Sequence, residues 1–171
     1  DGVVDLMKPR AEAKGLRLDA EMTGISSQRF MGDAGRIRQV LLNLVNNAIK
    51  FTDAGSVNIH VEVVERSDQA RIRLSVRDTG AGIPPDCLEG VFARYQRSEG
   101  VSDRSGAGAG LGLAISRQLV DLMGGTLGVS SAVDEGTCFW AEIELGHGPE
   151  NTLRVVESDG TGQVLIREGA S

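Results

Sequence analysis

The sequence predicts an α+β protein, a two-layer α/β sandwich in which a mixed, mostly antiparallel sheet carries helices on one face. Several short segments alternate apolar and polar side chains, which is typical of half-buried strands. Longer segments repeat apolar side chains at helical spacing. The order of these segments favours a single mixed sheet, and we expect its other face to be partly exposed to solvent.

Composition and charge describe an ordinary globular chain. Its 171 residues suit one domain, placed at residues 1–146, with a linker or truncated tail at residues 147–171. The net charge of −6 and the lack of a basic run argue against a nucleic-acid partner. No apolar run is long enough for a membrane span, so we expect a cytoplasmic domain without membrane contact, whatever anchors the parent protein. The first residue is not Met, which indicates a piece of a longer protein.

The first third of the chain predicts helix, strand and helix. Residues 1–14 have helical spacing that Gly15 ends, and we expect Pro9 to disturb this helix. Residues 16–22 alternate as a strand does, and a short strand is expected at residues 29–31, before the central helix.

The central helix is predicted at residues 33–52, with Asp33 as its N-cap. It is mostly apolar, so it should pack into the domain on most sides. A narrow polar stripe follows one edge: Arg36, Gln39, Asn43, Asn47 and Lys50. Amide oxygens can ligate a hard cation, and a Lys and an Arg can face phosphate. A core helix with a solvated edge would carry the same pattern, and this stretch alone leaves both interpretations open.

The remaining elements follow the same logic. Residues 57–63 and 71–76 alternate on either side of a turn, so they should be antiparallel neighbours. A short helix near residues 86–91 precedes a polar, Gly- and Ser-rich stretch that we expect to be a mobile loop. A helix is expected at residues 110–123, with one apolar side made by Leu111, Ala114, Ile115, Leu119 and Leu122. Two further strands are expected, at residues 127–129 and 138–145.

Three local patterns suggest binding, and each has a simpler explanation. Asp78 follows a strand and precedes glycines, so its carboxylate can accept from a donor such as an adenine amino group, although a plain turn would look the same. Alternating glycines at residues 106–112 open a helix and expose N–H groups suited to phosphate, although a flexible hinge would also explain them. Arg94 or Arg97 can swing over a phosphate, or their segment can simply anchor a loop.

Taken together, the motifs resemble one family. NLVNNAIKFT, DTGAGIP, VFARYQR and GAGLGLAI resemble, in order, the N, G1, F and G2 boxes of the catalytic and ATP-binding domain of bacterial sensor histidine kinases. These kinases belong to the GHKL superfamily, which also includes gyrase and mismatch-repair ATPases. The resemblance covers roughly residues 1–145, and the set is far more specific than any single box. It implies a Bergerat fold that holds ATP and Mg2+ between the N-box helix and a flexible lid.

The resemblance also implies roles for matched residues. Asn47 matches the magnesium ligand, and Asp78 matches the Asp that recognises adenine. Asn43, Lys50 and Arg97 match residues near the phosphates and make up the expected catalytic set. Further nucleotide contacts are expected from Gly80, Gly82, Ile83, Gly108, Gly110, Leu111 and Gly112. The chain departs from the family pattern at Tyr95, where the F box usually has Phe, and at Gly106 and Ala107 in the lid.

One position separates a kinase from an ATPase. Hydrolysing members of the superfamily generally carry a Glu one turn before the magnesium-binding Asn, and here that position is Asn43. An amide cannot take a proton from water. The resemblance therefore implies transfer of the γ-phosphoryl group to a His on a separate dimerisation domain of the same kinase, with a response-regulator receiver domain downstream. His60 and His147 lie outside any acceptor motif, so the chain should bind Mg-ATP without phosphorylating itself.

Two other interpretations stay open. An ATP-driven conformational clamp of the gyrase type would hydrolyse ATP as the isolated chain. A degenerate module that docks partners would bind no nucleotide. In addition, LRVVESDG faintly resembles the start of a receiver domain, which would make the parent a hybrid kinase, although the acidic residues at 157–159 are not a clean pair.

Overall fold

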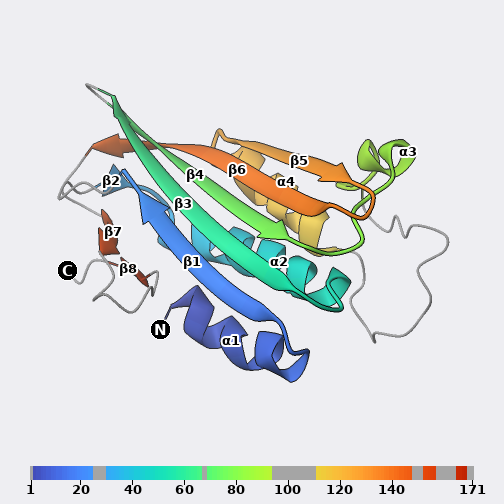
Figure 1. Ribbon diagram of the computed structural model, residues 1–171. Coiled ribbons are helices and arrows are strands. Elements are labelled where there is room, and N and C mark those ends of the chain that lie inside the picture. Colours follow the sequence, from blue (N-terminus) through green and yellow to red (C-terminus); the bar gives the residue numbers. More distant parts are fainter. Residues whose placement is uncertain are drawn as a thin grey trace.

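Figure 1 presents the computed structural model of the chain, which describes residues 2–24, 30–66, 69–93, 111–147, 152–156 and 165–168. The helices are α1 (Val3–Ala13), α2 (Ala34–Phe51), α3 (Pro85–Leu88) and α4 (Gly112–Leu122). The strands are β1 (Arg17–Thr23), β2 (Phe30–Met31), β3 (Ser56–Arg66), β4 (Gln69–Asp78), β5 (Thr126–Ala132), β6 (Gly136–His147), β7 (Thr152–Val156) and β8 (Leu165–Glu168). Within these ranges, no helix combines the length and the apolar character needed to cross a membrane.

The strands form one mixed sheet in the order β1-β3-β4-β6-β2-β7-β8, and β5 also pairs with β6. β1 and β3 run parallel, and the other described pairs are antiparallel. β3 and β4 form the predicted hairpin, with Val57 opposite Asp78. The mixed, mostly antiparallel sheet that the sequence predicts is confirmed.

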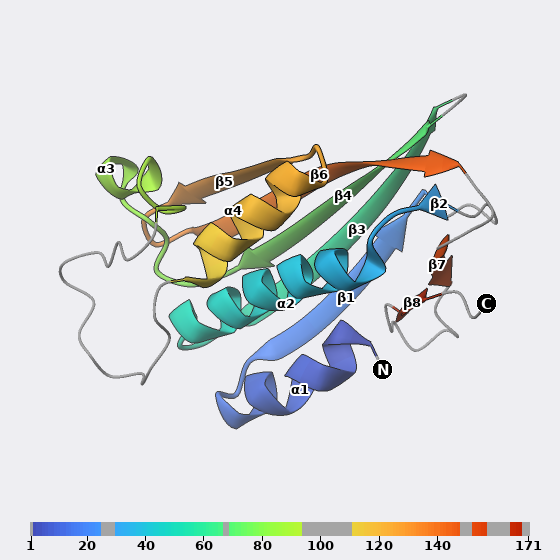
Figure 2. The same ribbon diagram turned by 180° about the vertical axis from the view of Figure 1, so that it is seen from behind.

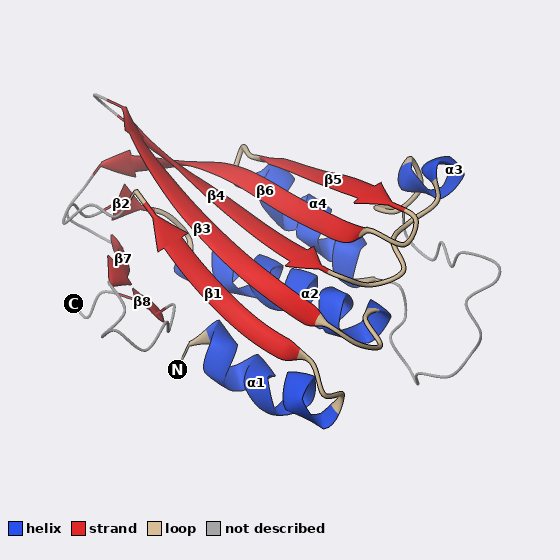
Figure 3. Cartoon of the chain, viewed as in Figure 1, coloured by secondary structure: helices blue, strands red, loops and turns tan. Residues whose placement is uncertain are grey.

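The helices cover one face of this sheet. Figure 2 shows α1, α2 and α4 against that face, and Figure 3 shows the opposite face uncovered. The strands alternate accordingly, because successive side chains point to opposite faces. On β3, for example, Ile59 and Val61 are fully buried, whereas His60 and Glu62, which alternate with them, are only half-buried. The two-layer sandwich is therefore confirmed.

α2 supplies the middle of the core. Asp33 caps it as predicted, because the Asp33 carboxylate accepts a hydrogen bond of 3.0 Å from the Arg36 backbone N–H. Its buried residues are Ile37, Val40, Leu41, Leu44, Val45, Ala48 and Ile49. The first two side chains of the polar stripe are exposed, whereas the last three, Asn43, Asn47 and Lys50, are half-buried. The stripe thus becomes less exposed toward the C-terminal half of α2.

The expected disturbance at Pro9 is wrong, because α1 runs through this residue without a break. A proline in a helix removes one hydrogen bond to the carbonyl four residues earlier, here Asp5. Pro9 and Asp5 both lie on the exposed side of α1, so water can satisfy that carbonyl. Burial of Val4, Met7 and Ala11 holds the other side.

The side of α4 that packs inward also differs from the prediction. Of the predicted apolar side, Ala114 is buried and Leu119 packs against the core, as expected, but Ile115 and Leu122 are 37% and 70% exposed. Ser116 and Val120, which were not predicted, are buried as well. The physical reason is that the Ser116 hydroxyl makes its hydrogen bonds on the inner side. A count of apolar side chains could not predict that a serine lies on the inner side of α4.

The uncovered face of the sheet carries a tryptophan. A side chain at Gly128 would collide with the Trp140 ring, so this glycine lets the indole lie flat on β5. The Arg73 guanidinium stands 5.2 Å from the ring centroid and pairs with Glu142 at 3.3 Å. Trp140 is therefore held between neighbouring strands on the side away from the helices.

Candidate functional site

The carboxylate at the end of β4 is the most buried charged group of the candidate site. Asp78 is 5% exposed, and its Oδ1 accepts hydrogen bonds from the backbone N–H groups of Gly80 at 2.8 Å and Thr137 at 3.2 Å. Burial raises the pKa of Asp78, and these two hydrogen bonds oppose that rise with smaller effects. Within the described part of the chain Oδ2 has no hydrogen-bond partner, so it is left for a donor on a ligand.

Gly80 brings this carboxylate close to the end of α2. A Cβ placed at Gly80 would lie 2.6 Å from the Phe51 carbonyl oxygen and 3.1 Å from Thr52 Oγ1. The 2.6 Å distance to a backbone oxygen is shorter than real Cβ contacts, and the 3.1 Å distance is tight, so glycine fits this position best. The Asp78 carboxylate and the C-terminal end of α2 therefore belong to one site.

The loop after Gly80 is fixed on its other side by the turn between β5 and β6. Gly82 has a φ of +74°, and a side chain there would collide with the Ala132 carbonyl. The Ile83 backbone N–H donates to Ser131 Oγ at 2.8 Å, and the Asp134 N–H donates to the Ala81 carbonyl at 2.8 Å. Backbone groups on both sides thus determine the shape of this loop.

Two polar residues of this region, Thr137 and Ser131, were not among the predicted site residues. Thr137 is 6% exposed, and it donates its backbone N–H to Asp78 and shares a hydrogen bond of 2.8 Å between its hydroxyl and Ser131 Oγ. Thr137 is brought there by the pairing of β4 with β6, in which Arg77 lies opposite Cys138. The available signal was the Gly136-Thr137 pair just before the predicted strand at residues 138–145, and it points to Asp78 only once the pairing of β4 with β6 is known.

A second cluster joins α2 to α4. Asn43 Nδ2 donates to the Gly112 carbonyl at 3.3 Å and to Ser116 Oγ at 3.2 Å. The Ser116 hydroxyl, which is fully buried, donates in turn to the Gly112 carbonyl at 2.9 Å. The structure therefore brings Asn43 and Gly112 into direct contact, and no described residue bonds to Asn43 Oδ1.

The start of α4 is suited to an anion. Leu111 precedes the helix and gives it no side-chain cap. The first N–H groups of a helix lack partners within the helix and lie at the positive end of its dipole. A phosphate bound at this end would meet those N–H groups.

Asn47 and Lys50 lie between the two clusters. Both are half-buried on the same edge of α2 as Asn43, and the Lys50 ammonium stands 5.2 Å from the centroid of the Phe51 ring. From Asn43 to Thr52 the helix axis covers about 14 Å at the usual rise per residue. The edge of α2 thus links the α4 cluster to the Asp78 cluster.

Three predicted site residues lie outside the described residues: Arg97, Gly108 and Gly110. Their roles stay predictions.

Comparisons with known proteins identify relatives. The family model described as "Histidine kinase-, DNA gyrase B-, and HSP90-like ATPase" matches residues 32–147. Sensor histidine kinase AruS of Pseudomonas aeruginosa is 44% identical over 146 residues, which cover 85% of this chain and 15% of that protein. Signal transduction histidine-protein kinase BarA of Escherichia coli is 36% identical over 150 residues, covering 87% of this chain and 16% of that protein. The chain thus spans about a sixth of the length of these two relatives.

Solved structures give the same result. Full-length ShkA in complex with AMPPNP matches with a TM-score of 0.72 and 37% identity, covering 85% of this chain and 29% of that chain. The nucleotide-free catalytic domain of histidine kinase ThkA matches with a TM-score of 0.62 and 26% identity, covering 83% of this chain and 88% of that chain.

Proposed function

The chain belongs to the histidine kinase-, DNA gyrase B- and HSP90-like ATPase family, and from this premise we propose that it is the cytoplasmic ATP-binding catalytic domain of a sensor kinase. It binds Mg-ATP and supplies the γ-phosphoryl group to a His on a separate dimerisation domain of the same kinase. The phosphoryl group then passes to a receiver domain. In this proposal residues 1–146 form the catalytic domain and residues 147–171 a linker or tail.

The observation that carries the proposal is the unused oxygen of Asp78. A buried carboxylate whose one oxygen accepts from two backbone donors, and whose other oxygen has no partner among the described residues, is suited to a single further donor, such as the adenine amino group. Gly80, Gly82 and Ile83 form the loop beside this carboxylate, and in the proposal the base lies along that loop. A donor bonded to Oδ2 would also relieve the unfavourable burial of the charge.

The edge of α2 and the start of α4 would hold the phosphates. Asn47 fits Mg2+ because an amide oxygen is a ligand for hard cations, and the bound ion would neutralise phosphate charge. Lys50 and Arg97 supply positive charge, and the N–H groups from Gly108, Gly110, Leu111 and Gly112 would contact phosphate oxygens. Asn43 stands where a hydrolysing relative carries a base, and an amide cannot activate water. This favours transfer to a His over hydrolysis.

The test is a titration of the chain with a fluorescent ATP analogue, with Mg2+ and with EDTA. We expect magnesium-dependent binding that Asp78→Asn and Asn47→Asp weaken strongly. Incubation with radiolabelled ATP should leave the chain unlabelled, and adding a dimerisation domain that carries the acceptor His should give phosphohistidine on that domain. Absence of binding would favour the docking module, and steady release of phosphate by the isolated chain would favour the clamp.

A further inference from the structure

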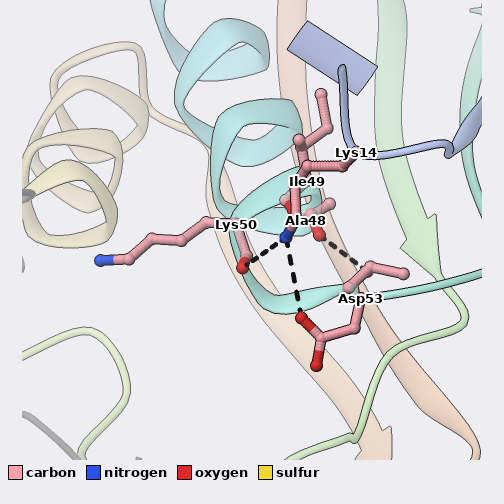
Figure 4. Close-up of polar contacts among 6 residues, drawn as sticks. Lys14, Ala48, Ile49, Lys50 and Asp53 are labelled. Atoms are coloured by element: carbon pink, nitrogen blue, oxygen red, sulfur yellow. Dashed lines mark hydrogen bonds and ion pairs between the residues drawn. The ribbon is translucent and has the colours of Figure 1, made fainter. Parts of the chain in front are cut away.

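The C-terminal end of α2 is closed by side chains. The last carbonyls of a helix lack N–H partners within it, and a glycine turn commonly satisfies them. Here Thr52 Oγ1 donates to the Ala48 carbonyl at 2.7 Å, and the Lys14 ammonium donates to the carbonyls of Ile49 at 2.7 Å and Lys50 at 3.1 Å. Figure 4 shows Lys14 reaching this end of the helix.

Lys14 is set in place by the end of another helix. Its own N–H donates to the Ala11 carbonyl at 3.0 Å, and Gly15, with a φ of +69°, turns the chain so that the Leu16 N–H also reaches Ala11, at 2.9 Å. Ala11 and Leu16 are both buried in the core. The backbone of Lys14 is therefore held firmly, and its side chain extends from α1 to α2.

The contact holds the backbone of Lys50 and leaves its side chain free. In Figure 4 the Lys50 side chain points away from Lys14, while its carbonyl faces the Lys14 ammonium. Asp53 adds little, because its carboxylate is 4.0 Å from the ammonium and fully exposed.

We propose that Lys14 is a positioning residue for the nucleotide site: it holds the last turn of α2 so that Lys50 presents its ammonium to the phosphates. The inference rests on the proposed function and extends it to a residue outside the four sequence motifs. Helix ends fray within the last turn, and a cation near the last carbonyls opposes fraying. Asn47 lies further in, where its carbonyl accepts the Phe51 N–H as in any helix interior. The loss of Lys14 should therefore act on Lys50 more than on Asn47.

The first experiment compares Lys14→Met with a matched control, Lys8→Met. Lys8 is an exposed lysine on α1, the helix that ends just before Lys14. The readout is the affinity of the 171-residue chain for the fluorescent ATP analogue with Mg2+, measured well below the melting temperature. Lys14→Met should weaken binding about fivefold, a change typical of one charge at a helix end. Lys8→Met should leave the affinity unchanged, and Lys14→Arg, which keeps the cation, should restore most of it.

The second experiment repeats Lys14→Met in a Lys50→Met background. If Lys14 acts through Lys50, its removal changes the affinity little once the Lys50 ammonium is gone. A merely structural role would lower the melting temperature and leave the affinity of the folded variant intact, or weaken binding equally in both backgrounds. Either result overturns the inference.

A third variant covers the case in which Lys14→Met does not fold. Lys14→Gln keeps an N–H donor without the charge, and it should show a smaller loss of affinity that also disappears in the Lys50→Met background. A wild-type chain that binds no nucleotide would reject the proposed function. A wild-type chain that binds, with Lys14 variants equal to Lys8→Met, would reject only the role of Lys14.

Discussion

The two ends of the candidate site are formed by different kinds of groups, backbone groups at one end and side chains at the other. At the Asp78 end, backbone N–H groups and glycines with no room for a side chain determine the geometry. At the other end, the groups are side chains along one edge of α2, and Asn43 reaches α4 through a single amide. Backbone-built geometry is rigid, whereas side chains lose rotamer freedom when a ligand orders them. The Asp78 end should therefore determine which base binds, and the α2 end should adapt to the phosphates.

The largest expected effect is at the rigid end. Asp78→Asn keeps an oxygen for the two backbone donors and replaces the free Oδ2 with an N–H2 group that would face the adenine amino group. Two donors face to face leave a buried polar group unpaired, so the affinity for ATP should fall about 100-fold. The measurement is the analogue titration, with the exposed Asp86→Asn as control. A loss equal to that of the control would remove Asp78 from the site.

The same variant should not destabilise the nucleotide-free chain at neutral pH. Burial raises the pKa of Asp78 in the folded state, so its contribution to stability is complete below the unfolded pKa and is lost as pH rises through the folded pKa. At pH 7, which lies above the unfolded pKa, burial of Asp78 therefore costs stability that the uncharged amide does not lose, and Asp78→Asn should be at least as stable as wild type. Denaturant unfolding at several pH values checks this, and the advantage of the variant should shrink as the pH is lowered toward the unfolded pKa.

A pair of glycine substitutions tests the rigidity directly. Gly82→Ala combines a positive φ with a collision at the Ala132 carbonyl, and it should lower the unfolding free energy by about 2 kcal/mol. At Gly112 a Cβ would meet Asn43 Cγ at 3.9 Å, an ordinary contact, so Gly112→Ala should change stability by less than about 1 kcal/mol. Denaturant unfolding measures both, and equal losses would contradict the contrast between the two ends.

A smaller effect is expected from Ser116→Ala. The substitution removes a buried hydroxyl that accepts from Asn43 and donates to Gly112, and Asn43 Nδ2 keeps its bond to the Gly112 carbonyl. The unfolding free energy should fall by about 1 kcal/mol. Ser116→Cys, which retains a weak donor and acceptor, should lose less. A stability equal to wild type for Ser116→Ala would show that the cluster contributes nothing to the contact between α2 and α4.

The smallest effect is expected at the start of α2. Asp33→Ala removes the N-cap and should lower stability by about 1 kcal/mol or less. Asp33 is exposed and lies three helical turns before Asn43, so ATP affinity should not change. A weakened affinity in the titration would mean that the site responds to the whole of α2, and the division into two ends would then be too sharp.

Much of the fold and of the candidate site could be predicted from local sequence patterns. The Asp33 cap, the polar stripe of α2 and the position of Asp78 at a strand end are all signalled within a few residues. The resemblance to one family supplied their expected chemistry from motif order, and the comparisons confirm the family.

Contacts between distant segments could not be anticipated in the same way. Thr137 reaches Asp78 only through the pairing of β4 with β6. Ser131 reaches Thr137 and Ile83 through the pairing of β5 with β6. Ser116 faces Asn43 because of how α4 is rotated against α2, and this rotation also leaves Ile115 exposed, against the apolar count. Hydrogen bonds between elements leave no periodic trace in either segment. The division near residue 146 and the role of Arg97 stay predictions.

The indole that lies flat on Gly128 has a practical consequence. Trp140 is the only tryptophan of the chain. On β6 it stands between the buried Phe139 and Ala141, so its side chain points to the face of the sheet away from α2. Its ultraviolet emission should therefore follow the integrity of the sheet and remain silent to events on the helical side. One sample can then yield two independent signals, native emission for unfolding and a dye on the nucleotide for occupancy.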